Sequence, residues 1–252
     1  MPKLQGKVAL VTGGADGIGE AACRALAAEG ATVVVSDINL AGAEKVAGDI
    51  RNGAWACELN VCEEAAWQAA LDEIIGRSGQ LDILVNNAGG NGAGNVEEIS
   101  FDDFRNAMRL NLDSVFIGSK LAIELMKARG GNIINVSSIH GIRAAAHAAS
   151  YTAAKGAVRL LTKSIALHCA QHGYGIRSNS IHPGYILTTQ MKDWVAGQED
   201  PDEMMAGLVA QHPIGFLGDP ADIGAGIVFL ASDDSRFMTG SELVMDGGFC
   251  LV

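Results

Sequence analysis

The stretch Lys7–Gly19 reads KVALVTGGADGIG and carries the clearest structural signal in the chain. Its apolar beginning, Lys7–Val11, predicts a buried β-strand, and the glycines that follow predict a tight turn. The alanine-rich residues Glu20–Glu29 then predict an α-helix. Strand, glycine turn and helix in this order are typical of dinucleotide binding, because glycines let the backbone approach a pyrophosphate whose charge lies at the helix N-terminus.

The glycine spacing is TGxxxGxG rather than the usual GxGxxG. A glycine turn alone is only a turn in most proteins. This one follows a predicted strand and opens a predicted helix, which is the context that dinucleotide binding requires. We therefore predict that a dinucleotide cofactor contacts Gly13, Asp16, Gly17, Ile18 and Gly19.

A second predicted strand, Thr32–Ser36, ends in Asp37, eighteen residues after Gly19. An acidic side chain there can hold both hydroxyls of an adenosine ribose and repels a 2′-phosphate. The same residue can simply cap the next helix, as Asn39 can. No arginine or lysine stands at the neighbouring positions 15, 16 and 38 to receive a phosphate. We predict NAD as the cofactor rather than NADP.

Strands and helices alternate along the rest of the chain. Further strands are predicted at 54–59, 81–85, 131–136, 176–181 and 242–245, and helices at 40–51, 63–77, 101–128, 150–172 and 220–231. Residues 186–217 are helical, methionine-rich and irregular in pattern. This alternation predicts the α/β class, with a doubly wound, Rossmann-like parallel sheet covered by helices on both faces. Without a linker or repeat in the sequence, residues 1–252 are expected to form a single domain.

The composition narrows the classes of partner. The chain has 252 residues, 48% of them hydrophobic, which suffices for one substantial core. A net charge of −11 argues against nucleic acid and anionic membrane surfaces. The sequence has no apolar run of membrane-spanning length, and Met1–Gln5 is not a signal peptide. Five cysteines without metal-ligand spacing favour reduced thiols in a cytoplasmic protein with no structural metal.

The stretch Tyr151–Lys155 reads YTAAK and places a phenol and an ammonium four residues apart on a predicted helix. Residues at this spacing are neighbours, and the ammonium is expected to pull the tyrosine pKa below its ordinary value of about 10. The YxxxK pattern is common on ordinary helices. Its combination with the glycine turn and with Ser138, thirteen residues before Tyr151, favours a reactive pair.

Two asparagine positions have two interpretations each. Asn86–Gly89 (NNAG) closes a predicted strand, and its amides either line a nucleotide crevice or tie neighbouring strand ends together. Asn111 interrupts the predicted helix 101–128, where an asparagine usually faces solvent.

Taken together, these residues resemble the short-chain dehydrogenase/reductase family over essentially the whole chain. The matching positions are Thr12–Gly19, Asn86–Gly89, Asn111, Ser138, Tyr151, Lys155, Pro183, Gly184 and Asp246–Gly248.

The resemblance implies a catalytic set and a mechanism. Tyr151, as phenolate, takes the hydroxyl proton of an alcohol, and Ser138 hydrogen-bonds the substrate oxygen. Lys155 lowers the tyrosine pKa and binds the nicotinamide ribose. Asn111 holds a water that links Lys155 to solvent as a proton relay.

The resemblance also implies cofactor contacts beyond the glycine turn, at Asn60, Val61, Asn87, Ala88, Gly89, Tyr151, Lys155, Pro183, Gly184, Ile186 and Thr188. Asn60 stands where the family more often has aspartate, but its oxygen can still accept a hydrogen bond from the adenine amino group. The family further implies a homotetramer assembled through the two long helices, 101–128 and 150–172.

The family places its substrate lid at about 186–217. Its methionines and tryptophan suit a ring or bulky hydrocarbon, although some of them serve only to pack the lid. Its acidic residues repel anionic substrates, with Arg143 as a counterweight. The stretches Gly173–Met191 and Gly240–Val244 are similar to bacterial short-chain enzymes that oxidise hydroxysteroids and cyclic alcohols. The expected reaction is reversible oxidation of an uncharged, apolar, cyclic secondary alcohol.

The candidate substrate contacts are His140, His147, Tyr185, Met191 and Trp194. The two histidines lie outside the family pattern. His147 is expected either to orient a polar substituent of the substrate or to face solvent as an ordinary loop histidine.

Two other functions remain open. A catalytically silent NAD-binding protein can share this fold, although the complete set Asn111, Ser138, Tyr151 and Lys155 argues against it. A 3-oxoacyl-(acyl-carrier-protein) reductase is also similar in sequence, but such enzymes use NADPH, which Asp37 disfavours.

Overall fold

The computed structural model describes residues 2–90, 92 and 94–252. Over these residues a seven-stranded parallel sheet has the order β3-β2-β1-β4-β5-β6-β7. The strands are β1 (Val8–Thr12), β2 (Thr32–Asp37), β3 (Trp55–Glu58), β4 (Ile83–Asn86), β5 (Gly131–Val136), β6 (Ile176–Pro183) and β7 (Glu242–Met245). The α-helices are α1 (Gly17–Ala28), α2 (Leu40–Ile50), α3 (Glu64–Ser78), α4 (Phe101–Met108), α5 (Ser114–Met126), α6 (Ala149–Gln171), α7 (Thr189–Ala196), α8 (Pro201–Ala210) and α9 (Pro220–Ala231). The expected α/β fold with one doubly wound sheet is confirmed.

The strand order reverses between β1 and β4. The chain first builds outward from β1 through β2 to β3, then returns to place β4 on the other side of β1. The helices leaving β1 and β4 therefore cover opposite faces of the sheet, and a crevice opens at the carboxyl ends of these two strands.

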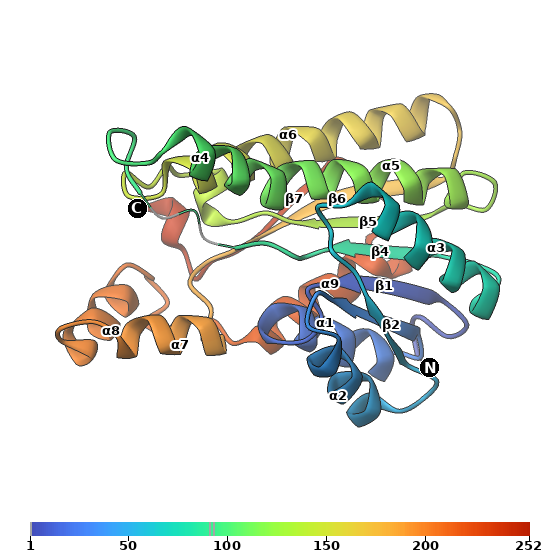
Figure 1. Ribbon diagram of the computed structural model, residues 1–252, viewed down its shortest axis with the longest axis horizontal. Helices are drawn as coiled ribbons and strands as arrows, with labels where there is room; N and C mark the ends of the chain where they lie inside the picture. The colour runs from blue at the N-terminus through green and yellow to red at the C-terminus, as the bar shows by residue number, and fades with distance from the viewer. Residues whose placement is uncertain (1, 91, 93) are drawn as a thin grey trace.

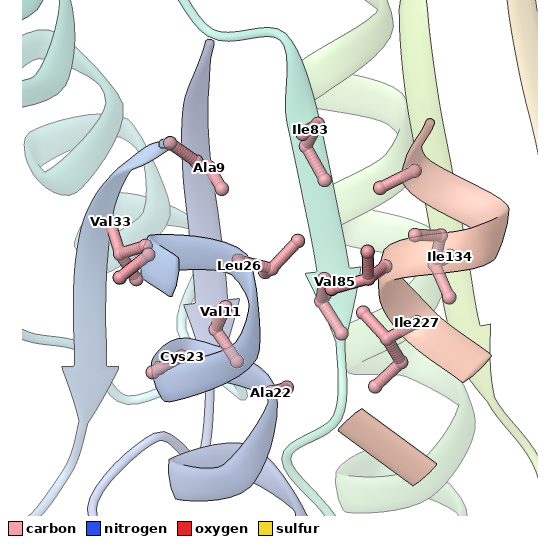
Figure 2. Close-up of a cluster of buried hydrophobic side chains, with 14 of the residues drawn as sticks. Ala9, Val11, Ala22, Cys23, Leu26, Val33, Ile83, Val85, Ile134 and Ile227 are labelled. Atoms are coloured by element: carbon pink, nitrogen blue, oxygen red, sulfur yellow. The ribbon is translucent and has the colours of Figure 1, made fainter. Parts of the chain in front are cut away.

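The sheet is buried on both faces because successive side chains along each strand alternate between two cores. In β1, Ala9 and Val11 point to a core under α1, α2 and α9, whereas Val8 and Leu10 point to a core under α3, α5 and α6. Figure 1 shows these two helical layers, and Figure 2 shows the first core, where Leu26 of α1 and Ile227 of α9 meet the strands. Strands buried on both faces explain the continuous apolar run at the start of the chain.

The predicted long helix at 101–128 is divided. A π-helical turn, Arg109–Asp113, separates α4 from α5. The wider turn carries Asn111, whose side chain is 1% exposed. The usual solvent-facing position of a helical asparagine is therefore not the one adopted here, and the interruption serves to aim this side chain inward.

The irregular region 186–217 consists of α7 and α8 with non-helical chain around them. Asp200 caps α8 and Pro201 occupies its first turn, so the helical pattern is broken between the two helices. Both helices project to one side of the sheet, at the left of Figure 1. They share a small core of Val195, Leu208 and Leu217. Further partly buried residues pack against this core, namely Tyr185, Leu187, Met191, Met204, Met205 and Val209.

The five cysteines are free thiols. In the described part of the chain, no helix combines the length and apolarity that a bilayer crossing requires.

Candidate active site

A cavity of about 450 Å³ opens at the carboxyl ends of the central strands. Its wall includes most of the predicted site residues: Gly13, Asp16, Gly17, Ile18, Gly19, Asp37, Asn87, Ala88, Gly89, Ser138, His140, His147, Tyr151, Pro183, Gly184, Tyr185, Ile186, Thr188, Met191 and Trp194. Among the residues that the structure describes, the lining of the cavity contains two carboxylates, Asp16 and Asp37, and neither lysine nor arginine. The tertiary structure thus brings together residues that are spread along the chain from Gly13 to Trp194.

The glycine turn between β1 and α1 lines the cavity and has backbone conformations and close contacts that glycine accommodates. Gly13 and Gly17 have φ values of +65° and +56°, in the left-handed region that favours glycine. A Cβ at Gly19 would lie 1.9 Å from the carbonyl oxygen of Gly13. Asp16 caps α1 by accepting a hydrogen bond from the Gly17 amide at 2.7 Å. This cradle at a helix N-terminus fits the pyrophosphate of a dinucleotide.

Asp37, at the end of β2, is oriented by two backbone amides. Its Oδ2 accepts from the Ala15 amide at 3.1 Å and its Oδ1 accepts from the Asn39 amide at 2.9 Å. The cap of α2 is Asn39, which accepts from the Gly42 amide at 3.1 Å. Asp37 is therefore not needed as the helix cap, and its carboxylate lines the cavity where a ribose can bind.

The asparagines after β4 tie strand ends together. Asn86 Nδ2 donates to Asn135 Oδ1 at 2.8 Å, which joins β4 to β5. Asn87 Nδ2 donates to the carbonyl oxygens of Thr12 at 2.9 Å and Gly13 at 3.1 Å, which joins β4 to the glycine turn. Asn87 also lines the cavity. Both interpretations of this motif thus apply, since Asn86 only ties strands together whereas Asn87 does so and also lines the cavity.

Tyr151 and Lys155 lie on the first turns of α6. Lys155 is 3% exposed, and its Nζ donates to the Val136 carbonyl oxygen at 2.9 Å. The Nζ lies 5.6 Å from the centroid of the Tyr151 ring. Burial lowers the pKa of Lys155 to about 8.

The tyrosine pKa moves against expectation. Burial raises the pKa of Tyr151 above its ordinary value, and a hydrogen bond with Ser138 opposes the shift. The predicted lowering by Lys155 is wrong for this arrangement, because loss of solvent outweighs an ammonium that is itself directed at Val136.

Asn111 is anchored to the loop after β4. Its Oδ1 accepts from the Gly90 amide at 3.2 Å, and its Nδ2 donates to the carbonyl oxygens of Gly90 and Ala107, each at 3.0 Å. A Cβ at Gly89 would lie 2.8 Å from Asn111 Oδ1 and 3.4 Å from Lys155 Nζ. Asn111 thus sits behind the wall close to Lys155, and its amide hydrogens are already used. Only the second lone pair of its oxygen is left for the predicted water relay.

His182 contributes to the site and was missed in the sequence. It is fully buried at the end of β6, beside Pro183. Its Nδ1 lies 3.1 Å from the Ser138 carbonyl oxygen and its Nε2 lies 2.8 Å from Ser180 Oγ. Because a carbonyl only accepts, Nδ1 carries the hydrogen and Nε2 accepts from Ser180. The sequence feature that could have indicated this role is the position of His182 at the end of a predicted strand, directly before the Pro183–Gly184 turn.

The substrate side of the cavity contains an aromatic group centred on His140. Its ring centroid lies 6.3 Å from those of Tyr151 and His147 and 5.9 Å from that of Tyr185. His147 is exposed at the edge of the cavity, so it combines both predicted positions, facing solvent while lining the wall.

Besides Asn111 and Lys155, which lie behind the wall, three further predicted residues are absent from the lining of the cavity. Arg143 donates to the carbonyl oxygens of Phe249 and Val252, so its charge is engaged at the end of the chain. Its expected role as a counterweight for anionic substrates is not supported. Asn60 and Val61 follow β3 outside the lining, and Asn60 Oδ1 accepts from the Cys62 amide at 3.1 Å. Their contact with adenine stays a prediction.

A family model of short-chain dehydrogenases/reductases, described as enoyl-(acyl carrier protein) reductase, matches residues 13–250. The chain belongs to the short-chain dehydrogenase/reductase family. The sequence prediction of this family is therefore confirmed. Membership makes the protein an oxidoreductase that works with a nicotinamide cofactor.

Three relatives within the short-chain dehydrogenase/reductase family are similar over nearly the full chain. A 3-alpha-(or 20-beta)-hydroxysteroid dehydrogenase of Mycobacterium tuberculosis is 41% identical over 98% of this chain and 90% of its own. A cyclopentanol dehydrogenase of Comamonas testosteroni is 42% identical over 99% of both chains. An NADP-dependent (R)-specific alcohol dehydrogenase of Lentilactobacillus kefiri is 40% identical over 98% of both.

Proposed function

We propose that the protein is an NAD-dependent dehydrogenase that interconverts an uncharged, apolar, cyclic secondary alcohol and its ketone. The observation that carries this proposal is the single cavity joining Asp37 and the glycine turn to Tyr151 and Ser138. A ribose recognised at one end and a proton carrier at the other are what hydride transfer to a dinucleotide requires.

The nicotinamide cofactor, when bound, supplies the hydride acceptor or donor. Tyr151 takes the proton of the alcohol during oxidation and returns it during reduction. Ser138 donates a hydrogen bond to the substrate oxygen, on which negative charge develops. Lys155 favours the phenolate form of Tyr151 when it is charged, and its low pKa lets it pass a proton onward near neutral pH.

The preference for NAD rests on charge. A 2′-phosphate placed beside Asp37 would meet a carboxylate held in position by two amides, and the described lining offers no cation to offset the repulsion. The Lentilactobacillus relative uses NADP, so the choice varies among similar chains.

The substrate class rests on the wall formed by the lid. Met191 and Trp194 line the cavity as adaptable apolar surface, and Trp194 remains 46% exposed there. The names of two relatives specify hydroxysteroid and cyclopentanol substrates, which are apolar cyclic alcohols. The phosphate of a phosphopantetheine substrate would find no basic side chain among the lining residues that the structure describes.

The test is a steady-state panel of cyclopentanol, cyclohexanol, hydroxysteroids, sugars and 3-hydroxyacyl thioesters, each with NAD and with NADP. We expect the highest kcat/KM for a cyclic or steroid alcohol with NAD. A clear preference for a thioester with NADP would instead support an acyl-carrier-protein reductase. Cofactor binding without turnover of any alcohol would indicate a catalytically silent protein.

We also propose a homotetramer assembled through α5 and α6. These helices expose large apolar side chains that an interface would cover: Phe116 is 53%, Leu160 68% and Leu167 62% exposed. Light scattering after size exclusion tests this, with Leu160→Glu and Leu167→Glu expected to reduce the mass per particle. A monomer in the unmodified protein would contradict it.

A further inference from the structure

We propose that the cavity contains a second polar subsite, the hydroxyl oxygen of Tyr185, which selects substrates carrying an additional hydroxyl group near the reacting carbon. This inference rests on the proposed function, since it specifies which cyclic alcohols and ketones the same cavity prefers. Tyr185 and its neighbour His140 line the cavity together with Tyr151.

The hydrogen positions on His140 follow from its surroundings. Its Nδ1 lies 3.3 Å from the carbonyl oxygen of Arg143. Because a carbonyl oxygen only accepts, Nδ1 must carry the hydrogen. Burial lowers the pKa of His140, so the ring is neutral at pH 7 and its Nε2 has only a lone pair to offer.

That lone pair determines what Tyr185 presents to a ligand. The Tyr185 hydroxyl oxygen lies 3.5 Å from His140 Nε2, and the hydroxyl must donate because Nε2 accepts. The remaining lone pairs of the Tyr185 oxygen can then only accept. A substrate hydroxyl satisfies these lone pairs by donating a hydrogen bond. An ether or carbonyl oxygen at the same point has no hydrogen to donate, so two acceptor oxygens would face each other.

Tyr185 is held in place independently of the substrate. Its backbone amide donates to His212 Nε2 at 3.3 Å, and its ring packs edge-on against Phe249 with centroids 5.9 Å apart. A fixed acceptor loses little conformational entropy when a ligand binds. The centroids of His140 and Tyr151 are 6.3 Å apart, so this group stands beside the residue that carries the proton.

The experiment compares hydroxy-ketones with their methyl ethers, so that each molecule has one reacting carbonyl. The 3- and 4-hydroxycyclohexanones, the 3- and 4-methoxycyclohexanones and cyclohexanone are reduced with the cofactor that the alcohol panel identifies. We expect kcat/KM for the better hydroxy-ketone to exceed that of its methyl ether by about tenfold, the size of one hydrogen bond.

Variants assign this ratio to the two side chains. Tyr185→Phe should bring the hydroxy-to-methoxy ratio to about one, whereas the matched control Tyr174→Phe, at the opposite end of β6 from Tyr185, should keep it. His140 acts through Tyr185 as a positioning residue. His140→Phe should lower the ratio by letting the Tyr185 hydroxyl donate to the ether, and His140→Gln should restore it, because its Oε1 can accept in place of Nε2.

A ratio near one in the unmodified protein, or a high ratio that survives Tyr185→Phe, would overturn the inference while cyclohexanone reduction still upholds the proposed function. Equal ratios in His140→Phe and His140→Gln would show that His140 does not orient the Tyr185 hydroxyl. The argument that the Tyr185 oxygen acts only as an acceptor would then fail. If none of the ketones is reduced, the proposed function fails and this inference with it.

Discussion

His182 Nδ1 lies 3.1 Å from the carbonyl oxygen of Ser138, although the two residues are 44 positions apart. Ser138 also accepts from the Gly141 amide at 3.0 Å through the same carbonyl. The backbone of Ser138 is thereby held from two sides, while its side chain faces the cavity. A buried neutral histidine thus positions a residue expected to touch the substrate oxygen, since burial lowers the pKa of His182.

Replacing His182 should therefore affect turnover. His182→Ala removes the donor to Ser138, and we expect kcat to fall by about tenfold with little change in the dissociation constant for NADH. His182→Asn keeps a donor near the Nδ1 position and should retain most of kcat. Steady-state kinetics and fluorescence titration with NADH measure these effects. If both variants lose kcat equally, His182 only fills space.

Tyr151→Phe keeps the ring and deletes the proton carrier. Turnover should fall by at least about a hundredfold, whereas NAD binding should persist because the glycine turn and Asp37 are unchanged. In the unmodified protein, alcohol oxidation should accelerate with rising pH, because burial raises the Tyr151 pKa and the phenolate becomes more abundant as the solution becomes alkaline. Tyr174→Phe is the matched control. Retention of most turnover in Tyr151→Phe would exclude the tyrosine as the base.

The buried Lys155 should make the free energy of unfolding depend on pH. Burial lowers its pKa to about 8 from 10.5, so the folded protein binds this proton less tightly than the unfolded chain does. The free-energy cost of burying the charged lysine lowers stability fully below about pH 8, and this cost disappears as the pH rises through 10.5. Relative to Lys155→Met, the free energy of unfolding of the unmodified protein should thus rise by up to about 3 kcal/mol across this window.

Urea denaturation of the cofactor-free protein at several pH values measures this difference. Lys45→Met, at an exposed position on α2, is the control and should run parallel to the unmodified protein. A difference between Lys155→Met and the unmodified protein that stays constant with pH would show that the lysine is fully solvated.

Asp37→Ala should change cofactor preference. Loss of the carboxylate removes the ribose contact and the repulsion of a 2′-phosphate, so NAD should weaken more than NADP. The ratio of kcat/KM values for the two cofactors is the measurement. Asn39→Ala, which removes the α2 cap, should cost about 1 kcal/mol of stability and leave that ratio unchanged. Comparable efficiency with both cofactors before mutation would contradict the role of Asp37.

The features that depend on neighbours along the chain can be predicted from the amino-acid sequence. The apolar run before Gly13 and the glycines after it specify a buried strand and a close turn, because backbone sterics and side-chain alternation are local properties. The Tyr151–Lys155 spacing places both side chains on one stretch of α6 for the same reason. The break at Asn111 was likewise visible, although its inward direction was not.

The environments of these groups depend on the tertiary structure. Pairing of β5 with β6 sets Val136 beside Ile181, and this brings His182 under Ser138. The same packing buries Tyr151 and directs the Lys155 ammonium at Val136, so desolvation raises the tyrosine pKa where the spacing alone predicted a lower one. Desolvation and contacts across strands depend on which distant segments become neighbours. The spacing of residues along one helix determines which side chains are close, but not how much water the rest of the chain leaves around them.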